Sequence, residues 1–165
     1  GNPYVGFLYA GLMIAPDGAI KVLEYNCRFG DPETQPIMMR LKSDLVELCE
    51  AALTDKLDTI GADWDDKVAL GVVMAAGGYP DSYQQGFAIS GLPNLEQEGV
   101  KVFHAGTHMQ NDAVVTAGGR ALCVCALGDS ILEAQTKAYE LTKDIHWDDV
   151  YYRTDIGFKA IAKGF

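Results

Sequence analysis

Two stretches near the start of the chain have the residue patterns of β-strands. Residues 5–14 form an apolar and aromatic run, which predicts a buried strand. Residues 20–26 alternate along the chain, which predicts a second strand. Pro16-Asp17-Gly18 lies between them and is typical of a tight turn, because proline presets the first turn position and glycine accepts a positive φ. The pattern therefore predicts an antiparallel hairpin, and we expect it to be the edge of a larger sheet.

The alternation in the second strand brings two oxygen-bearing side chains to one face. Glu24 and Asn26 are expected to project together with Ile20 and Val22. A carboxylate and an amide oxygen two residues apart can bind one hard cation such as Mg²⁺. The same short Glu-x-Asn spacing also occurs at an exposed strand end followed by a polar loop, so the spacing by itself leaves both interpretations open.

Two helices are predicted after the hairpin. Residues 27–36 contain one glycine, two prolines and several charges, which is typical of a loop. A helix is expected to begin near Thr34 and to end near Arg40. Ser43 is the predicted N-cap of a second helix, and residues 54–66 form a polar, acidic connector. The apolar stripe of that second helix consists of Leu45, Val46, Leu48, Cys49, Ala52 and Leu53.

The rest of the chain predicts a small sheet with one main helix. Residues 68–76 form an apolar run typical of a buried strand, and residues 81–99 contain scattered Gly, Pro and Ser. A helix is predicted at 130–144, where Asp129 and Ser130 both offer capping oxygens. Further short strands are expected at 100–104, 113–116, 120–127 and 150–152, and a last helical turn at 155–162.

The predicted fold class is α+β. An antiparallel hairpin with helices occupies residues 1–60, and a small mixed α/β domain occupies residues 61–165. Hydrophobic residues make up 48% of the chain and charged residues 22%, an ordinary balance for a globular protein.

Charge and cysteine content narrow the classes of function. The net charge of −10 argues against a nucleic-acid surface, because phosphate contacts need clustered Lys and Arg. No apolar run approaches the roughly 20 residues that a membrane span needs. The four cysteines form no Cys-x-x-Cys pair, so we expect reduced thiols in a cytoplasmic protein.

The densest group of polar residues, LEYNCRFGDPETQP at 23–36, resembles a known superfamily. A strand ending in Glu-x-Asn, followed by an arginine and an acidic loop with proline, is similar to the last metal-binding strand of ATP-grasp enzymes. The longer string EYNCRFGDPETQPIMMRL, preceded by GFLYAGLMI, resembles the phosphoribosylamine–glycine ligase family specifically. The resemblance continues through AAGGYP, HAGT and GGR to AYELTKDIHWDDVYYRTDIGFKAI at 138–161, so it covers nearly the whole chain.

The family resemblance implies an ATP-dependent reaction in purine synthesis that joins glycine to 5-phosphoribosylamine through glycyl phosphate. ATP, glycine and 5-phosphoribosylamine are the implied partners, with neither nucleic acid nor a membrane. The resemblance implies that Glu24 and Asn26 bind Mg²⁺ or Mn²⁺. Many ATP-grasp enzymes carry a further acid on the preceding strand, but residues 9–13 have none, so we expect two protein ligands.

Three catalytic and two substrate-binding residues are implied in the same way. Arg28 would neutralise charge on a phosphoryl group in transit, and the acids Asp31 and Glu33 would orient an amine or accept its proton. Thr34 is expected to bind substrate in the same loop. Gly78 is a further substrate-binding candidate, although a plain turn after a buried strand explains it equally well.

The resemblance also implies that the chain is the C-terminal portion of a longer enzyme. In the family, the adenine pocket, the mobile phosphate-covering loop and the N-terminal domain all precede the hairpin. We therefore expect the chain to be inactive alone and to require that N-terminal portion. Two alternatives stay open at this point: a part of another ATP-grasp enzyme of the carboxylase type, and a non-catalytic adaptor module.

Three other polar positions have simpler explanations. His104 and His108 are four residues apart, but Gly106 argues against the helix that a metal-binding pair at this spacing would need. A structural role is therefore expected for both histidines. Gly118-Gly119 is predicted to be a hairpin turn, and Arg120 after it is expected to form a surface ion pair.

Overall fold

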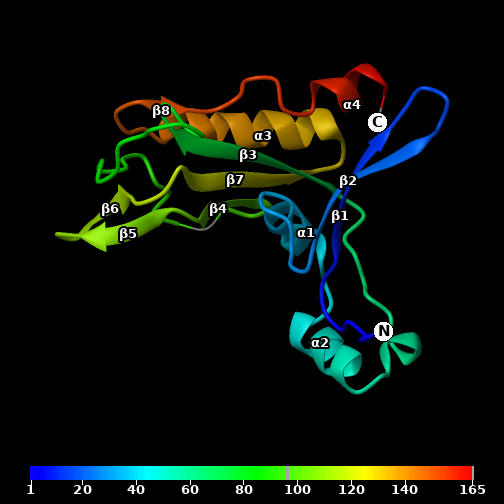
Figure 1. Ribbon diagram of the computed structural model, residues 1–165. Helices are drawn as coiled ribbons and strands as arrows, with labels where there is room; N and C mark the ends of the chain where they lie inside the picture. Colours follow the sequence, from blue (N-terminus) through cyan, green and yellow to red (C-terminus); the bar gives the residue numbers. More distant parts are fainter. Residues whose placement is uncertain (96, 165) are drawn as a thin grey trace. The chain divides into compact units, whose positions relative to one another are not determined.

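The computed structural model describes residues 1–95 and 97–164, which fold as two compact units (Figure 1). The first unit contains residues 1–34 and 41–64, and the second contains residues 35–40 and the chain from Asp65 onward. The mixture of helices with antiparallel sheets agrees with the predicted α+β class. The predicted boundary at residue 60 separates the end of one family domain from the next, which is a different division from the two compact units. It stays a prediction.

The first unit begins with the predicted hairpin. Strands β1 (Tyr9–Ile14) and β2 (Ile20–Asn26) pair antiparallel. At the turn, the backbone N–H of Gly18 donates to the carbonyl of Ala15 at 2.9 Å, and Gly18 has a φ of 83°. The Asp17 carboxylate accepts the backbone N–H of Ala19 at 3.0 Å. These bonds account for the Pro-Asp-Gly sequence of the turn.

A β-bulge interrupts the alternation of β2, which corrects one prediction. Leu12 pairs with Val22 and Gly11 pairs with Glu24, so Leu23 is an extra residue on β2. One extra residue shifts the side-chain alternation by one position. The prediction that Ile20, Val22, Glu24 and Asn26 all share one face is therefore wrong. Glu24 and Asn26 lie together beyond the bulge, where the pairing with Gly11 and Tyr9 is regular.

The hairpin is exposed, which corrects the prediction of a buried first strand. In β1 only Gly11 is buried. Within the described residues β1 pairs only with β2, and two strands cannot cover both of their own faces. The large apolar side chains left exposed on the hairpin are Leu12, Met13, Ile14, Ile20, Val22, Leu23 and Tyr25.

Helix α1 (Thr34–Arg40) has the predicted limits, but the cap of α2 (Leu45–Leu53) differs from the prediction. The Asp44 carboxylate, not Ser43, caps α2 by accepting the backbone N–H of Val46 at 2.7 Å. Ser43 instead accepts the backbone N–H of Asp63 at 2.7 Å. The predicted apolar stripe of α2 is only partly covered: none of its residues is buried, and Ala51, outside the stripe, is the one buried residue of the helix. A short 3₁₀ turn, η1 (Leu57–Thr59), follows α2.

The second unit is built on a four-stranded antiparallel sheet in the order β4-β7-β3-β8. Helix α3 packs along β3 and β7, as Figure 1 shows. Ala134 and Ala138 of α3 are fully buried, and their small side chains let the helix approach the sheet closely. The bounds of these elements are β3 (Val68–Ala76), β4 (Val100–His104), β7 (Arg120–Gly128), α3 (Ile131–Asp144) and β8 (Val150–Tyr151).

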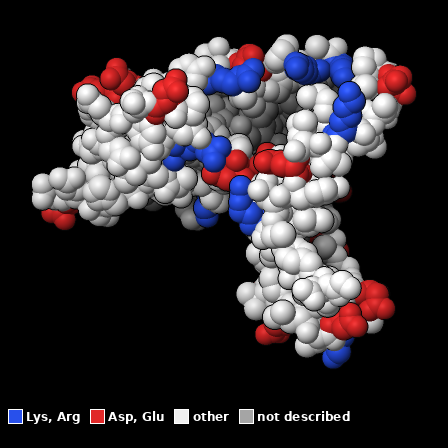
Figure 2. Space-filling view, in the orientation of Figure 1, with Lys and Arg blue, Asp and Glu red and all other residues white. Residues whose placement is uncertain are grey.

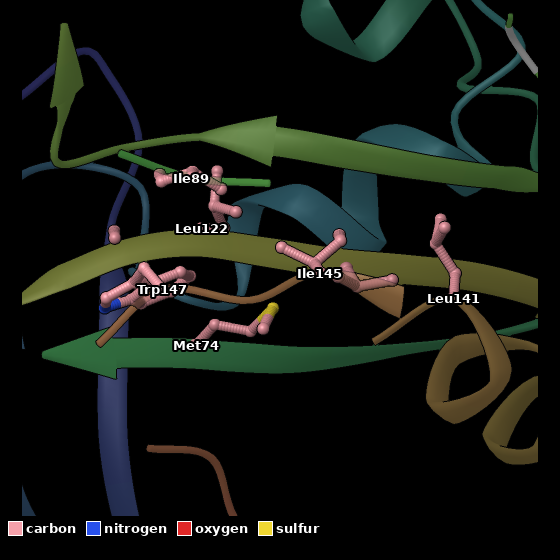
Figure 3. Packing of buried hydrophobic residues seen from close by; sticks show 8 residues of the cluster. Met74, Ile89, Leu122, Leu141, Ile145 and Trp147 are labelled. Carbon is pink, nitrogen blue, oxygen red and sulfur yellow. The ribbon is translucent and has the colours of Figure 1, made fainter. Parts of the chain in front are cut away.

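The core of the second unit is apolar and centred on the two long strands (Figure 3). Met74 of β3 and Leu122 of β7 are buried with Ile145 and Trp147, which follow α3. Cys123 and Cys125 share a face of β7, as predicted, with their Sγ atoms 3.6 Å apart. The hydrogen bond with the Cys123 thiol, together with burial, raises the pKa of Cys125. Both thiols are buried in the core.

The N-terminus of α3 confirms the predicted cap. Ser130 Oγ accepts the backbone N–H of Glu133 at 3.2 Å, and Glu133 Oε2 accepts that of Asp129 at 2.8 Å. Lys137 donates to Glu133 at 2.7 Å one turn later, and this bond holds the pKa of Glu133 below its usual value. Reciprocal capping therefore satisfies backbone donors at the start of the helix.

For the second, two-stranded sheet of this unit, only one of the two strands was predicted. Strand β5 (Thr107–Gln110) pairs antiparallel with β6 (Ala113–Thr116), and β5 was missing from the sequence prediction. Gly118-Gly119 is not a hairpin turn, because β7 pairs with β3 and β4 instead of β6. The last helix, α4 (Phe158–Ala162), begins three residues later than predicted, after Gly157 with a φ of 88°.

The described surface carries mixed charge. On the face drawn in Figure 2, Lys and Arg lie in separate small groups with Asp and Glu between them. No helix among the described residues has both the length and the apolar character to cross a membrane.

Candidate functional site

The end of β2 presents the predicted metal ligands. Glu24 is exposed and pairs across the hairpin with Gly11, and Asn26 pairs with Tyr9. A Cβ atom at Gly11 would lie 3.1 Å from Cγ of Glu24, so the glycine leaves space for this side chain. Within the described residues, neither Glu24 nor Asn26 uses its side chain in a hydrogen bond or ion pair. Their oxygen atoms are therefore available to a ligand.

The donor set suits a cation shared with a phosphate. Magnesium in nucleotide sites is held by one or two carboxylates together with substrate phosphates. Glu24 and Asn26 provide one carboxylate and one amide oxygen. No group of three His, Cys, Asp or Glu residues able to hold a metal occurs in the described part of the chain. The two residues fit a hard cation whose remaining ligands come from a substrate.

The arginine after the strand is held by its own loop. Arg28 is exposed, and its Nη1 donates to the carbonyl of Phe29 at 2.8 Å. The Phe29 ring stacks on Phe7, with 3.8 Å between ring centroids. A guanidinium has five N–H donors, so most of them remain for an anion.

Glu33 is fixed by two contacts that the sequence analysis did not include. The Tyr9 hydroxyl donates to Glu33 Oε1 at 3.5 Å, and the buried Gly30 lies directly against the Glu33 side chain. Asp31 is exposed in the same loop. No signal in the sequence indicated the role of Tyr9. Gly11 could have been noticed, because a glycine inside an apolar strand often marks a bulge or a close approach.

Thr34 begins α1 and bonds to the loop before it. Its hydroxyl and its backbone N–H both donate to the carbonyl of Gly30. The hydroxyl proton is therefore engaged, and a substrate would meet the oxygen lone pairs. Glu24, Asn26, Arg28, Asp31, Glu33 and Thr34 all belong to the first unit.

Gly78 belongs to the second unit and lies in a turn after β3. Its φ is 91°, and its carbonyl accepts the backbone N–H of Asp81 at 2.9 Å. A side chain at this position would clash with the Ser82 carbonyl. The turn explains the glycine, and a role in substrate binding stays a prediction.

The remaining polar candidates have structural contacts. The His104 ring nitrogen Nδ1 lies 3.0 Å from the Thr107 hydroxyl in the turn between β4 and β5. The Arg120 guanidinium lies over the Tyr79 ring at 5.9 Å from its centroid, and a side chain at Gly119 would collide with that ring.

Comparison with known proteins identifies the family. Residues 69–159 match the family model of the phosphoribosylglycinamide synthetase C domain, which is more than half of the chain. The chain belongs to the phosphoribosylglycinamide synthetase family. Residues 1–34 match the ATP-grasp (A) domain of the same synthetase, so the segment from Glu24 to Thr34 lies within the A-domain match.

Relatives of known name agree with this assignment. The chain is 63% identical over 163 residues to phosphoribosylamine–glycine ligase of Vibrio parahaemolyticus and 62% identical over 164 residues to that of Escherichia coli K12. Each match covers 99% of this chain and 38% of the relative, so the chain spans well under half of their length.

A solved structure of the same family has the same fold. The crystal structure of phosphoribosylamine–glycine ligase from Thermotoga maritima is similar with a TM-score of 0.74 and 37% sequence identity. The match covers 90% of this chain and 36% of the other. These comparisons concern whole segments of a synthetase, and the roles of single residues stay predictions.

Proposed function

We propose that this chain is the C-terminal portion of a phosphoribosylamine–glycine ligase and is inactive alone. The observation that carries the proposal is 62–63% identity, over 99% of the chain, to relatives with that name. Residues 1–60 would end the ATP-grasp domain, and residues 61–165 would form the C domain. The N-terminal portion of the same enzyme would contribute the adenine pocket.

The proposed reaction has two steps. The carboxylate of glycine attacks the γ-phosphorus of ATP, which gives glycyl phosphate and releases ADP. The amine of 5-phosphoribosylamine then attacks the acyl carbon, the phosphate leaves, and the nitrogen loses a proton. The products are glycinamide ribonucleotide and inorganic phosphate. The acyl phosphate must be kept from water between the steps.

Glu24 and Asn26 would hold Mg²⁺ or Mn²⁺ at the end of β2. When bound, such a cation neutralises charge on the ATP phosphates. The free side-chain oxygens of both residues and the open space over Gly11 support this assignment.

Arg28 would stabilise the phosphoryl group during its transfer. Its guanidinium can form two parallel hydrogen bonds to phosphate oxygens. The bond to the Phe29 carbonyl and the stack of Phe29 on Phe7 hold the loop from which Arg28 projects. Positioned charge of this kind contributes to catalysis without reorganisation during the reaction.

The acidic loop would act on the amine. Asp31 and Glu33 would orient the nucleophile or accept its proton, and the bond from Tyr9 restricts Glu33. Thr34 and Gly78 would contact substrate. We place the reaction in the cytoplasm, since all four cysteines of the chain are unpaired thiols.

Release of ADP by the full-length enzyme tests this proposal. Glycine and 5-phosphoribosylamine are supplied separately and then together. Release that requires both substrates would support the ligase. Release with bicarbonate in place of this pair would replace it with a carboxylase-type ATP-grasp enzyme, and no release under any condition would favour a non-catalytic module.

A further inference from the structure

A pocket of about 330 Å³ lies at the C-terminal end of β3, beside the Gly78 turn. It is formed by two parts of the second unit that are far apart in sequence: the chain from the turn after β3 to Phe87, and the residue before β8. Its lining consists of Gly77, Ser82, Tyr83, Gln84, Phe87 and Asp149.

Backbone contacts hold each wall of the pocket in place. Ala76 pairs with Val150, which brings Asp149 against Gly77, and a Cβ atom at Gly77 would lie 2.6 Å from the Asp149 carbonyl. The backbone N–H of Phe87 donates to the Thr116 hydroxyl at 3.2 Å. The pocket is therefore a fixed feature of the fold.

The lining suits a neutral ligand that carries hydroxyl groups. Ser82, Gln84 and Asp149 provide a hydroxyl, an amide and a carboxylate, and a carboxylate is a strong acceptor for hydroxyl donors. Tyr83 and Phe87 add aromatic surface. The lining contains no Lys or Arg, so it offers no charge to a phosphate group.

The residue that carries the carboxylate has an unusual backbone. Asp149 has a φ of 64°, in the left-handed region. Asp and Asn tolerate this conformation better than other residues with a side chain. Such positions occur often at ligand-binding sites, where the surrounding structure holds them.

We propose that this pocket binds the ribosyl group of a sugar phosphate through its hydroxyls, with Asp149 as the main acceptor. The inference rests on the proposed function, because 5-phosphoribosylamine is the substrate that carries this group there. The volume is at the small end for ligand pockets and suits one sugar ring. The 5-phosphate would lie outside the lining.

Titration of the full-length enzyme with ribose 5-phosphate by calorimetry tests the pocket without catalysis. Asp149→Asn keeps the shape and tolerates the left-handed backbone, so we expect an intact fold and a Kd about ten-fold higher. Gln84→Ala, at an exposed lining position, should also raise the Kd. The matched control is Asp148→Asn, which changes an exposed neighbour outside the lining and should leave the Kd unchanged.

Three results would overturn the proposal. The first is an equal Kd for the wild type, Asp149→Asn and Gln84→Ala. The second is no binding of ribose 5-phosphate at millimolar concentration, and the third is an equal loss in Asp148→Asn. Failure of the proposed function is a separate result, because the wild-type enzyme would then release no ADP with glycine and 5-phosphoribosylamine. The titration decides about the pocket in either case.

Discussion

Glu24 and Asn26 lie beyond the bulge in β2, with side chains that bond to no other described residue. That the two side chains share a face could be predicted from the sequence, because residues two apart on a strand point to the same side. The space over Gly11 could not be predicted, since it depends on which residue of β1 lies opposite Glu24. The fixed position of Glu33 likewise depends on Tyr9, which is remote in sequence.

Glu24→Gln in the full-length enzyme should weaken the binding of the magnesium that turnover requires. The change removes one ligand charge and keeps the side-chain size, so we expect the magnesium concentration for half-maximal rate to rise roughly ten- to hundred-fold. Rates measured across a magnesium titration check this. Glu47→Gln, on α2, is the matched control and should be normal. A normal magnesium requirement in Glu24→Gln would remove Glu24 from the metal site.

Arg28→Lys should lower kcat more than it changes the KM for ATP. A planar group with five donors is replaced by a point charge, so we expect a fall in kcat of roughly 10²-fold. Steady-state kinetics with varied ATP separate the two constants. Lys21→Arg, an exposed change on β2 before the Arg28 loop, is the control. An unchanged kcat in Arg28→Lys would rule out the phosphoryl role.

Elements formed by local rules were predicted more accurately than elements formed by distant pairing. Helix α3 begins after Ser130 because a hydroxyl, a glutamate and an apolar stripe all lie within one stretch of sequence. The cap of α2 was misplaced by one residue, since Ser43 and Asp44 are both good caps and only the bond from Asp63 to Ser43 decides between them. Strand β5 was missed because its partner, β6, defines it.

Ser130→Ala should destabilise the start of α3. The Glu133 backbone N–H would lose its acceptor, and we expect a loss of about 1 kcal/mol. Hydrogen exchange of the α3 amides measures the local free energy of opening. Ser130→Asp keeps a capping oxygen and should retain nearly all of the stability. Equal losses in the two variants would show that the cap contributes nothing.

Across the whole molecule, the two units differ in how much apolar surface they bury. The second unit encloses Met74, Leu122 and Trp147 between sheet and helix, whereas the hairpin of the first leaves its large apolar side chains exposed. Two strands without further cover are marginally stable in water. Stability should therefore be concentrated in the second unit.

The isolated chain should show this difference in hydrogen exchange. We expect amides of β3 and β7 to exchange far more slowly than those of β1 and β2, because the former lie in the buried sheet. Mass spectrometry after timed exposure to deuterated water checks this. Equal protection of both pairs would show that the hairpin is stable without further cover.

The sequence by itself determined the hairpin, the long strands, α3 and the Glu-x-Asn spacing. These features depend on periodicity and on residues within a few positions, which set local backbone preferences. It also determined the family, because long ordered strings of residues are specific. The tertiary structure alone decided the exposure of β1, the bulge at Leu23, the pairing of β7 with β3 and β4, and the pocket at Asp149. Each of these arises from contacts between residues far apart in the chain, which no local pattern encodes.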